Sequence, residues 1–148
     1  MRALVQRVTE GSVSIEGKVR GQIEKGLVIL LGITGNDTEE DALFLAGKCA
    51  NLRIFSDREG KFNLSCLEEK GEILVISQFT LYGDTRKGRR PSFIHAAPPE
   101  ISEPLYRKFI DKLKKMDLKV EEGVFGARMK VKIYNDGPVT LMVESKGI

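Results

Sequence analysis

A continuous apolar run from Leu27 to Leu31 is the feature that most constrains how this chain can fold. The run Leu-Val-Ile-Leu-Leu has the length of a strand and offers no polar face. Such a strand lies inside a sheet that is covered on both faces. The run is also far shorter than the roughly 20 apolar residues that a membrane-spanning helix requires. We therefore expect a buried central strand and no association with a membrane.

Strand-like segments outnumber helical ones along the rest of the chain. Polar and apolar residues alternate from Ser12 to Ile15, and the turn residues Glu16-Gly17-Lys18 follow, which predicts a hairpin. Besides Leu27 to Leu31 and the hairpin arms Ser12 to Ile15 and Val19 to Ile23, the predicted strands are Ala3 to Val8, Leu52 to Phe55, Ile73 to Leu81, Ala127 to Ile133 and Val139 to Val143.

Two segments have the spacing of helices with one apolar face. The first covers about residues 38–50, and the side chains of Asn36, Asp37 and Thr38 are available to cap it. The second is predicted to begin at a capping Ser102, with Pro104 in its first turn. The apolar stripe predicted for the second helix consists of Ile101, Leu105, Phe109, Leu113 and Met116.

These elements predict one α+β domain over residues 1–148, in which two helices pack on a twisted, mostly antiparallel sheet that tends toward a barrel. Cys49 and Cys66 form no CxxC pair, and His95 is the single histidine, so neither a metal nor a cofactor is expected. Met1-Arg2 leads directly into a strand-like segment rather than a signal sequence, which favours a cytoplasmic location.

Polar side chains interrupt an apolar strand where Ile73 to Leu81 ends. The residues are Ser77, Gln78, Phe79 and Thr80. Functional groups often lie where an element ends, which makes this segment a candidate site. An equally good interpretation is a sheet edge at which the hydroxyls of Ser77 and Thr80 bond to neighbouring backbone groups.

The segment from Tyr82 to Glu100 is long for a loop and rich in basic residues. Its four crowded cations are Arg86, Lys87, Arg89 and Arg90. With Tyr82 and Phe93 beside them, these cations suit phosphate contacts with a stacked base or ribose. A solvated loop is the alternative, and the net charge of only +3 does not decide between them.

A proline-containing segment, Asn135-Asp136-Gly137-Pro138-Val139-Thr140, joins the last two predicted strands. Composition alone favours a plain hairpin turn, because proline has no N–H for a strand ladder. A cis Gly-Pro bond is the other possibility, and it would let two carbonyls point in the same direction.

The sequence resembles the D-aminoacyl-tRNA deacylase family, also called the D-Tyr-tRNA deacylase family. Two motifs in order support the resemblance, SQFTLYGDTRKGRRPSF at 77–93 and NDGPVT at 135–140. The similarity extends to MRALVQRV at the start, NLRIFSDREGKFNLS at 51–65 and GVFGARMKV at 123–131. It therefore covers essentially the whole chain.

The resemblance implies a homodimer that acts on aminoacylated tRNA and needs no cofactor. In such a dimer, Ser77, Gln78, Phe79 and Thr80 of one subunit face Gly137 and Pro138 of the other. The two carbonyls at Gly137 and Pro138 would hold the substrate amino group and leave no room for an L side chain, whereas glycine would pass. Asn135, Val139 and Thr140 would complete the substrate site. The 2′-hydroxyl of the terminal adenosine would assist catalysis.

Two other functions remain open from the residues alone. A noncatalytic RNA-binding protein could grip phosphates with residues 86–90 and with Arg128, Lys130 and Lys132. A conventional esterase could use Ser77 or Thr80 as nucleophile with His95 as base. Because no base is evident beside Thr80, we expect it to position groups rather than attack.

Overall fold

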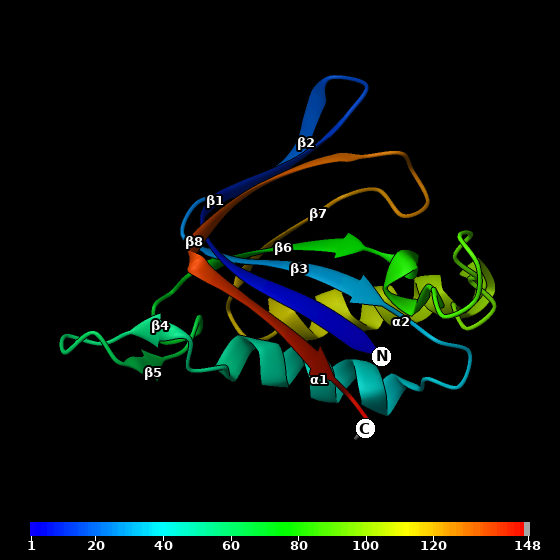
Figure 1. The fold of residues 1–148 in the computed structure, drawn as a ribbon. Coiled ribbons are helices and arrows are strands. Elements are labelled where there is room, and N and C mark those ends of the chain that lie inside the picture. The colour runs from blue at the N-terminus through cyan, green and yellow to red at the C-terminus, as the bar shows by residue number, and fades with distance from the viewer. Residues whose placement is uncertain (147–148) are drawn as a thin grey trace.

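The computed structural model describes residues 1–146 and has one large sheet with two α-helices packed on one side (Figure 1). In chain order the elements are β1 (Arg2–Ile15), β2 (Lys18–Ile23), β3 (Gly26–Gly32), α1 (Glu39–Asn51), β4 (Phe55–Ser56), β5 (Phe62–Leu64), β6 (Glu72–Ser77), the 3₁₀ helix η1 (Phe79–Tyr82), α2 (Pro99–Lys114), β7 (Lys119–Glu122) and β8 (Lys130–Glu144). None of the helices described within residues 1–146 is long and apolar enough to cross a bilayer.

The large sheet has six strands in the order β2-β1-β3-β6-β7, with β8 pairing to β1. Strand β1 is antiparallel to β2, β3 and β8, and the small β4–β5 pair is antiparallel too. Parallel pairing occurs between β3 and β6 and between β6 and β7, because α1 and α2 carry the chain back across the sheet. The mostly antiparallel α+β fold with two helices, predicted from the sequence, is confirmed.

Strand β1 belongs to two parts of the sheet. Residues 2–8 pair with β3, residues 11–15 pair with β2, and β8 follows β1 along both parts. Gly21 of β2 lies so close to β7 that a methyl group there would be 3.1 Å from the carbonyl oxygen of Glu122. The sheet is therefore rolled toward a barrel, as expected.

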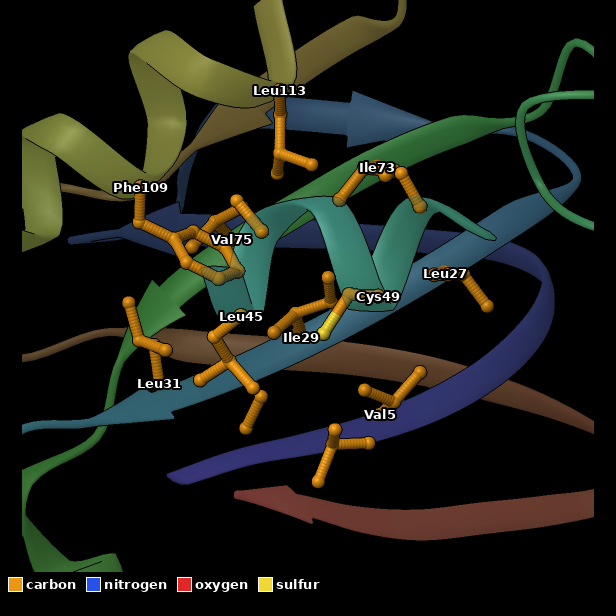
Figure 2. Close-up of a cluster of buried hydrophobic side chains, with 14 of the residues drawn as sticks. Val5, Leu27, Ile29, Leu31, Leu45, Cys49, Ile73, Val75, Phe109 and Leu113 are labelled. Atoms are coloured by element: carbon orange, nitrogen blue, oxygen red, sulfur yellow. The ribbon is translucent and has the colours of Figure 1, made fainter. Parts of the chain in front are cut away.

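Strand β3 separates two apolar cores. Leu27, Ile29 and Leu31 face the helices, where they pack in one cluster with Leu45 of α1 and Phe109 of α2 (Figure 2). On the opposite face, Val28 packs inside the rolled sheet in a second cluster whose other fully enclosed members are Val8, Val13, Ile23, Leu74 and Ile76. The prediction of a central strand covered on both faces is confirmed.

Helix α1 begins as the sequence predicts, and Thr38 is the capping residue of the three candidates. The backbone N–H of Asp41 donates to Thr38 Oγ1 at 3.4 Å, and the backbone N–H of Thr38 donates to Asp41 Oδ2 at 2.8 Å. This reciprocal capping satisfies two backbone donors that a helix leaves open. Three acidic residues in the first turn complement the positive end of the helix dipole.

Helix α2 begins earlier than predicted, and its buried face is rotated. It starts at Pro99, so Ser102 lies inside the first turn and donates its hydroxyl to the carbonyl of Pro98 instead of capping. The buried residues are Tyr106, Phe109, Ile110 and Leu113, whereas Ile101 is exposed. Pro99 fits the first helical position because its missing N–H would have no partner there.

Four predicted strands have different bounds in the structure. The segment Leu52 to Phe55 contributes only Phe55–Ser56 to a strand, and Ile73 to Leu81 is a strand only as far as Ser77. The segments Ala127 to Ile133 and Val139 to Val143 were expected to be separate, but they belong to the single strand β8, which starts at Lys130. Pairing with one long β1 keeps β8 continuous.

We predict that Tyr106→Phe lowers the free energy of unfolding by about 1–2 kcal/mol. The buried Tyr106 hydroxyl donates to the carbonyl oxygen of Val75 at 3.1 Å, and phenylalanine would leave that acceptor without this donor. Urea denaturation followed by circular dichroism measures the change. Tyr134→Phe is the control, because Tyr134 is exposed and should shift stability by less than about 0.5 kcal/mol. Equal stability of the two variants would contradict the prediction.

Candidate active site

A cleft opens where strand β6 ends, beside the start of α2. Its volume is about 560 Å³. Ser77, Gln78 and Phe79 line one side, and Phe125 and Met129 belong to the segment that precedes and enters β8. The lining is mainly apolar with a few polar groups, which is the usual composition of a pocket that binds a small organic group.

The polar segment at the end of β6 enters this cleft because the strand stops at Ser77. Ser77 still pairs with Leu31 of β3, and the backbone N–H of Gln78 donates to the carbonyl of Leu31 at 2.8 Å. The chain then tightens into η1, which leaves Phe79 56% exposed. The Phe79 ring meets the edge of Phe93 at a centroid distance of 5.1 Å. Phe79 and Phe93 thus form one wall of the cleft.

Thr80 lies at the rim of the cleft rather than inside it. Its Oγ1 accepts a hydrogen bond from the side-chain amide of Gln78, and no base contacts it among residues 1–146. The backbone N–H of Leu81 donates to Gln78 O. The preceding N–H groups, of Phe79 and Thr80, belong to the first turn of η1 and have no acceptor within it. They are available to a bound oxyanion.

His95 does not face Ser77. It lines a second pocket, and its carbonyl oxygen accepts a hydrogen bond from Thr34 Oγ1. The two cysteines are also unsuited to attack, because both are buried and burial raises the pKa of each thiol to about 12. The geometry therefore disfavours an esterase that pairs Ser77 or Thr80 with His95.

The basic loop, residues 85–91, is closed at its base by Asp84 and Ser92, which exchange backbone hydrogen bonds. Arg86 is tied to Asp84 by two side-chain bonds of 2.9 and 2.7 Å, which hold the pKa of Asp84 well below its usual range. Lys87, Arg89 and Arg90 are exposed, and no ion pair involves them within residues 1–146. Three of the four predicted cations are thus free for an anionic ligand.

The Gly137–Pro138 segment is an excursion within β8, not a hairpin between two strands. Val8 pairs with Asn135 and Gln6 with Thr140, so residues 136–139 bulge out opposite one residue of β1. The Gly137–Pro138 peptide bond is cis, and both residues are exposed. Proline is tolerated here because a bulge removes its position from the ladder.

Side chains hold the base of this excursion. Asn135 Oδ1 accepts from the backbone N–H of Val139 at 2.9 Å, and Asn135 Nδ2 donates to Thr140 Oγ1 at 2.7 Å. The bulge is thus closed from within, with Val139 buried beneath it. Gly137 and Pro138 lie in the exposed part of the excursion.

Arg7 also holds the excursion, although the sequence analysis did not single it out. Its Nε donates to the carbonyl of Asp136 at 3.1 Å, and its Nη1 donates to the carbonyl of Ile54 at 2.8 Å. The guanidinium also lies over the ring of Phe62, 5.4 Å from its centroid. The sequence shows only a charged residue inside a predicted strand, so its partners could not be foreseen.

The structure does not bring the two motifs together within one chain. Residues that pair across neighbouring strands form a row of the sheet. Ser77 lies in the row of Leu31, Ala3 and Val143, whereas Asn135 lies in the row of Val8, at the level where β6 begins. The rows are five residues apart, or roughly 17 Å along the strands. In Figure 1, β8 bends at the end of the sheet opposite to the tip of β6.

Comparison with known proteins identifies the family to which this fold and these motifs belong. A family model described as D-Tyr-tRNA(Tyr) deacylase matches residues 4–144. The chain belongs to the D-Tyr-tRNA(Tyr) deacylase family. Proteins named D-aminoacyl-tRNA deacylase from Fervidobacterium nodosum and Brevibacillus brevis are 55% and 59% identical to it. The matches cover 100% and 98% of this chain, and 99% and 100% of the two relatives.

Solved structures share the fold of this chain. A protein described as c-Myc DNA unwinding element binding protein is 42% identical, with a TM-score of 0.92 over 99% of this chain and 100% of that one. A probable eukaryotic D-amino acid tRNA deacylase has a TM-score of 0.84 over 97% of this chain and 98% of that one. At 20% identity, the second likeness concerns the fold alone.

Proposed function

We propose that this chain is a D-aminoacyl-tRNA deacylase, which hydrolyses the ester bond between a D-amino acid and the terminal ribose of tRNA. The observation that carries the proposal is the full-length similarity to proteins of that name, at 55–59% identity. The products are the free D-amino acid and tRNA. The cleft at the end of β6 receives the aminoacylated adenosine, which the apolar lining suits. The reaction belongs to the cytoplasm, where tRNA is charged.

The active unit in this proposal is a homodimer whose sites are shared between subunits. Residues 77–80 and the Gly137–Pro138 excursion lie at opposite ends of the sheet within one subunit, so a second subunit is needed to bring them together. Strand β8 supports such an interface, because it is an edge strand paired to β1 and exposes Leu141 and Met142 beyond the excursion. Apolar side chains on an edge strand favour association with another chain.

Chirality is selected by the Gly-cis-Pro excursion of the partner subunit. The carbonyls of Gly137 and Pro138 accept hydrogen bonds from the substrate α-ammonium group, while the bracing by Arg7 and Asn135 holds the backbone still. The Gly137–Pro138 backbone acts as a wedge: a D side chain points into open space, whereas an L side chain collides with this backbone. Glycine has no side chain to reject, so glycyl-tRNA is also a substrate.

Catalysis needs little from the protein, because an aminoacyl ester is already activated. The 2′-hydroxyl of the terminal adenosine assists the attack on the ester carbonyl. The N–H groups of Phe79 and Thr80 stabilise the developing oxyanion, while Ser77 and Gln78 hold the pocket in shape. Lys87, Arg89 and Arg90 contact RNA phosphates near the cleft, with Arg86 beside them.

Incubation with D-Tyr-tRNA and L-Tyr-tRNA tests the activity. We expect hydrolysis of the D form alone, and equal hydrolysis of both forms, or of neither, would overturn the proposal. Tight tRNA binding without turnover would instead support a noncatalytic RNA-binding protein. Hydrolysis of p-nitrophenyl esters that is lost in His95→Ala would support a conventional esterase.

We predict that two strongly impaired variants restore activity when they are co-expressed. Phe79→Ala removes a wall of the cleft, and Gly137→Ala disturbs the wedge that the partner receives. In a mixed dimer, one site combines an intact cleft with an intact wedge, so an equal mixture should recover about a quarter of wild-type activity. A double variant carrying both substitutions on one chain, mixed with wild type, gives the stoichiometric control. No recovery in the mixture would contradict a shared site.

A further inference from the structure

A second pocket of about 510 Å³ lies beside the cleft, and of its lining residues only Arg86 has a role in the function proposed above. Six of its lining residues matter here: Arg2, Thr34, Tyr82, Asp84, Arg86 and His95. Unlike the cleft, it is lined mainly by charged groups, hydroxyls and rings.

A thin wall separates this pocket from the cleft. Thr34 and Ala96 pair as a single β-bridge, so neighbouring residues of the same backbone face the two cavities. Ala96 lines the cleft, whereas Thr34 and His95 line the second pocket. Helix η1 is divided in the same way, with Phe79 toward the cleft and Tyr82 toward the second pocket. A polynucleotide whose last residue occupies the cleft can therefore place its preceding residue across this wall, in the second pocket.

The pocket offers a hydrogen-bond acceptor and a donor side by side. Asp84 Oδ1 accepts from the backbone N–H and the Nε of Arg86 at 3.0 and 2.9 Å, and Asp84 Oδ2 accepts from Nη2 at 2.7 Å. The fork fixes both groups, and its bonds leave the guanidinium Nη1 and lone pairs of the carboxylate open to a ligand. A bare phosphate would meet the negative Asp84, whereas a nucleobase edge has donors and acceptors of its own.

A second cation forms a flat platform in the same pocket. Arg2 donates from Nη1 to the carbonyl of Leu81 at 3.0 Å and from Nε to Glu144 at 2.6 Å. Its guanidinium lies over the Tyr82 ring, 4.6 Å from the centroid. Unpaired bases stack on planes of this kind while their Watson–Crick edges bond to side chains. The charge of Arg2 is balanced by Glu144, so this platform adds stacking area more than positive charge.

We propose that the second pocket binds the base of the nucleotide that precedes the terminal adenosine, which is a cytosine in the CCA end of tRNA. The exocyclic amino group of cytosine donates to Asp84, and its ring nitrogen or carbonyl accepts from Arg86. Uracil has a carbonyl where cytosine has the amino group, so it would face the Asp84 carboxylate with a second acceptor. This subsite rests on the proposed function and adds recognition of one further nucleotide to it.

Two D-Tyr-tRNA transcripts that differ only in this nucleotide, C or U, test the subsite after both are charged by an aminoacylating ribozyme. We expect kcat/KM to be roughly tenfold lower for U, as for the loss of one good base contact. Asp84→Asn should bring the C/U ratio close to one, because an amide can donate to the uracil carbonyl. Asp111→Asn on the exposed face of α2 is the matched control and should keep the ratio.

Binding of uncharged oligonucleotides that end in CCA or CUA gives a readout that does not need turnover. We expect the same preference in Kd for the wild type and its loss in Asp84→Asn. Equal kcat/KM and equal Kd for the two sequences would overturn the subsite while leaving the deacylase proposal intact. Absence of hydrolysis with both transcripts would overturn the proposed function, and the Kd ratio would then decide the subsite by itself.

Discussion

The Gly137→Ala variant is expected to lose on the order of 100-fold in kcat/KM toward D-Tyr-tRNA and to change the ratio of D to L hydrolysis. Gly137 has φ +129°, a conformation that side chains of L residues rarely adopt. A methyl group there would lie 2.8 Å from Val139 Cγ2 and 3.1 Å from Arg7 Nη2. The backbone must therefore shift, and the proposed wedge moves with it.

Gly17→Ala is the matched control for that experiment. Gly17 also has a positive φ, of +80°, but it lies in the β1–β2 turn with open space around it. This variant should lose about 1 kcal/mol of stability and retain both the rate and the D/L ratio. Single-turnover hydrolysis of D-Tyr-tRNA, L-Tyr-tRNA and Gly-tRNA measures the change. An unaltered D/L ratio in Gly137→Ala would show that chirality is selected elsewhere.

A D-Tyr-tRNA that ends in 2′-deoxyadenosine is expected to be nearly inert, with a rate lower by roughly 10²–10⁴-fold. The structure supports a reaction assisted by RNA, because the cleft has no histidine and both thiols are buried and protonated. Thr80→Ala should stay within about tenfold of the wild-type rate. Its hydroxyl lies at the rim and is engaged by Gln78, so its loss removes a positioning contact but no base or nucleophile.

The 2′-deoxy substrate and the Thr80→Ala variant should be compared under single-turnover conditions, so that product release does not mask the chemical step. A substrate with a single deoxyribose further from the 3′ end controls for altered RNA binding. Full activity on the 2′-deoxy substrate, together with an inactive Thr80→Ala, would restore Thr80 as the attacking group.

Local interactions explain why much of the fold was predictable. The apolar run at Leu27 to Leu31 is buried on both faces, and Thr38 caps α1 through contacts that span three residues. Leu45 and Cys49 follow from helical spacing, and both lie in the helix-side core (Figure 2). For such features, the residues that decide the structure are near one another in the sequence.

Contacts with distant residues explain the errors. The apolar character of Phe79 and Leu81 continued the strand pattern, but the chain turns into η1, where Phe79 packs against Phe93 from the far side of the basic loop. The two predicted strands at the C-terminal end are one strand, because β1 pairs with both halves and accommodates the bulge. Neither outcome is encoded in the spacing of nearby residues.

The sequence by itself determined the types of elements, the two motifs and the family, because these depend on local patterns and residue identity. Only the tertiary structure decided that the two motifs lie at opposite ends of the sheet within one subunit and that Arg7 braces the excursion. Strand register is set by pairs such as Val8 with Asn135, which are more than a hundred positions apart. Such pairings are selected by the packing of the whole sheet, so no local pattern could reveal them.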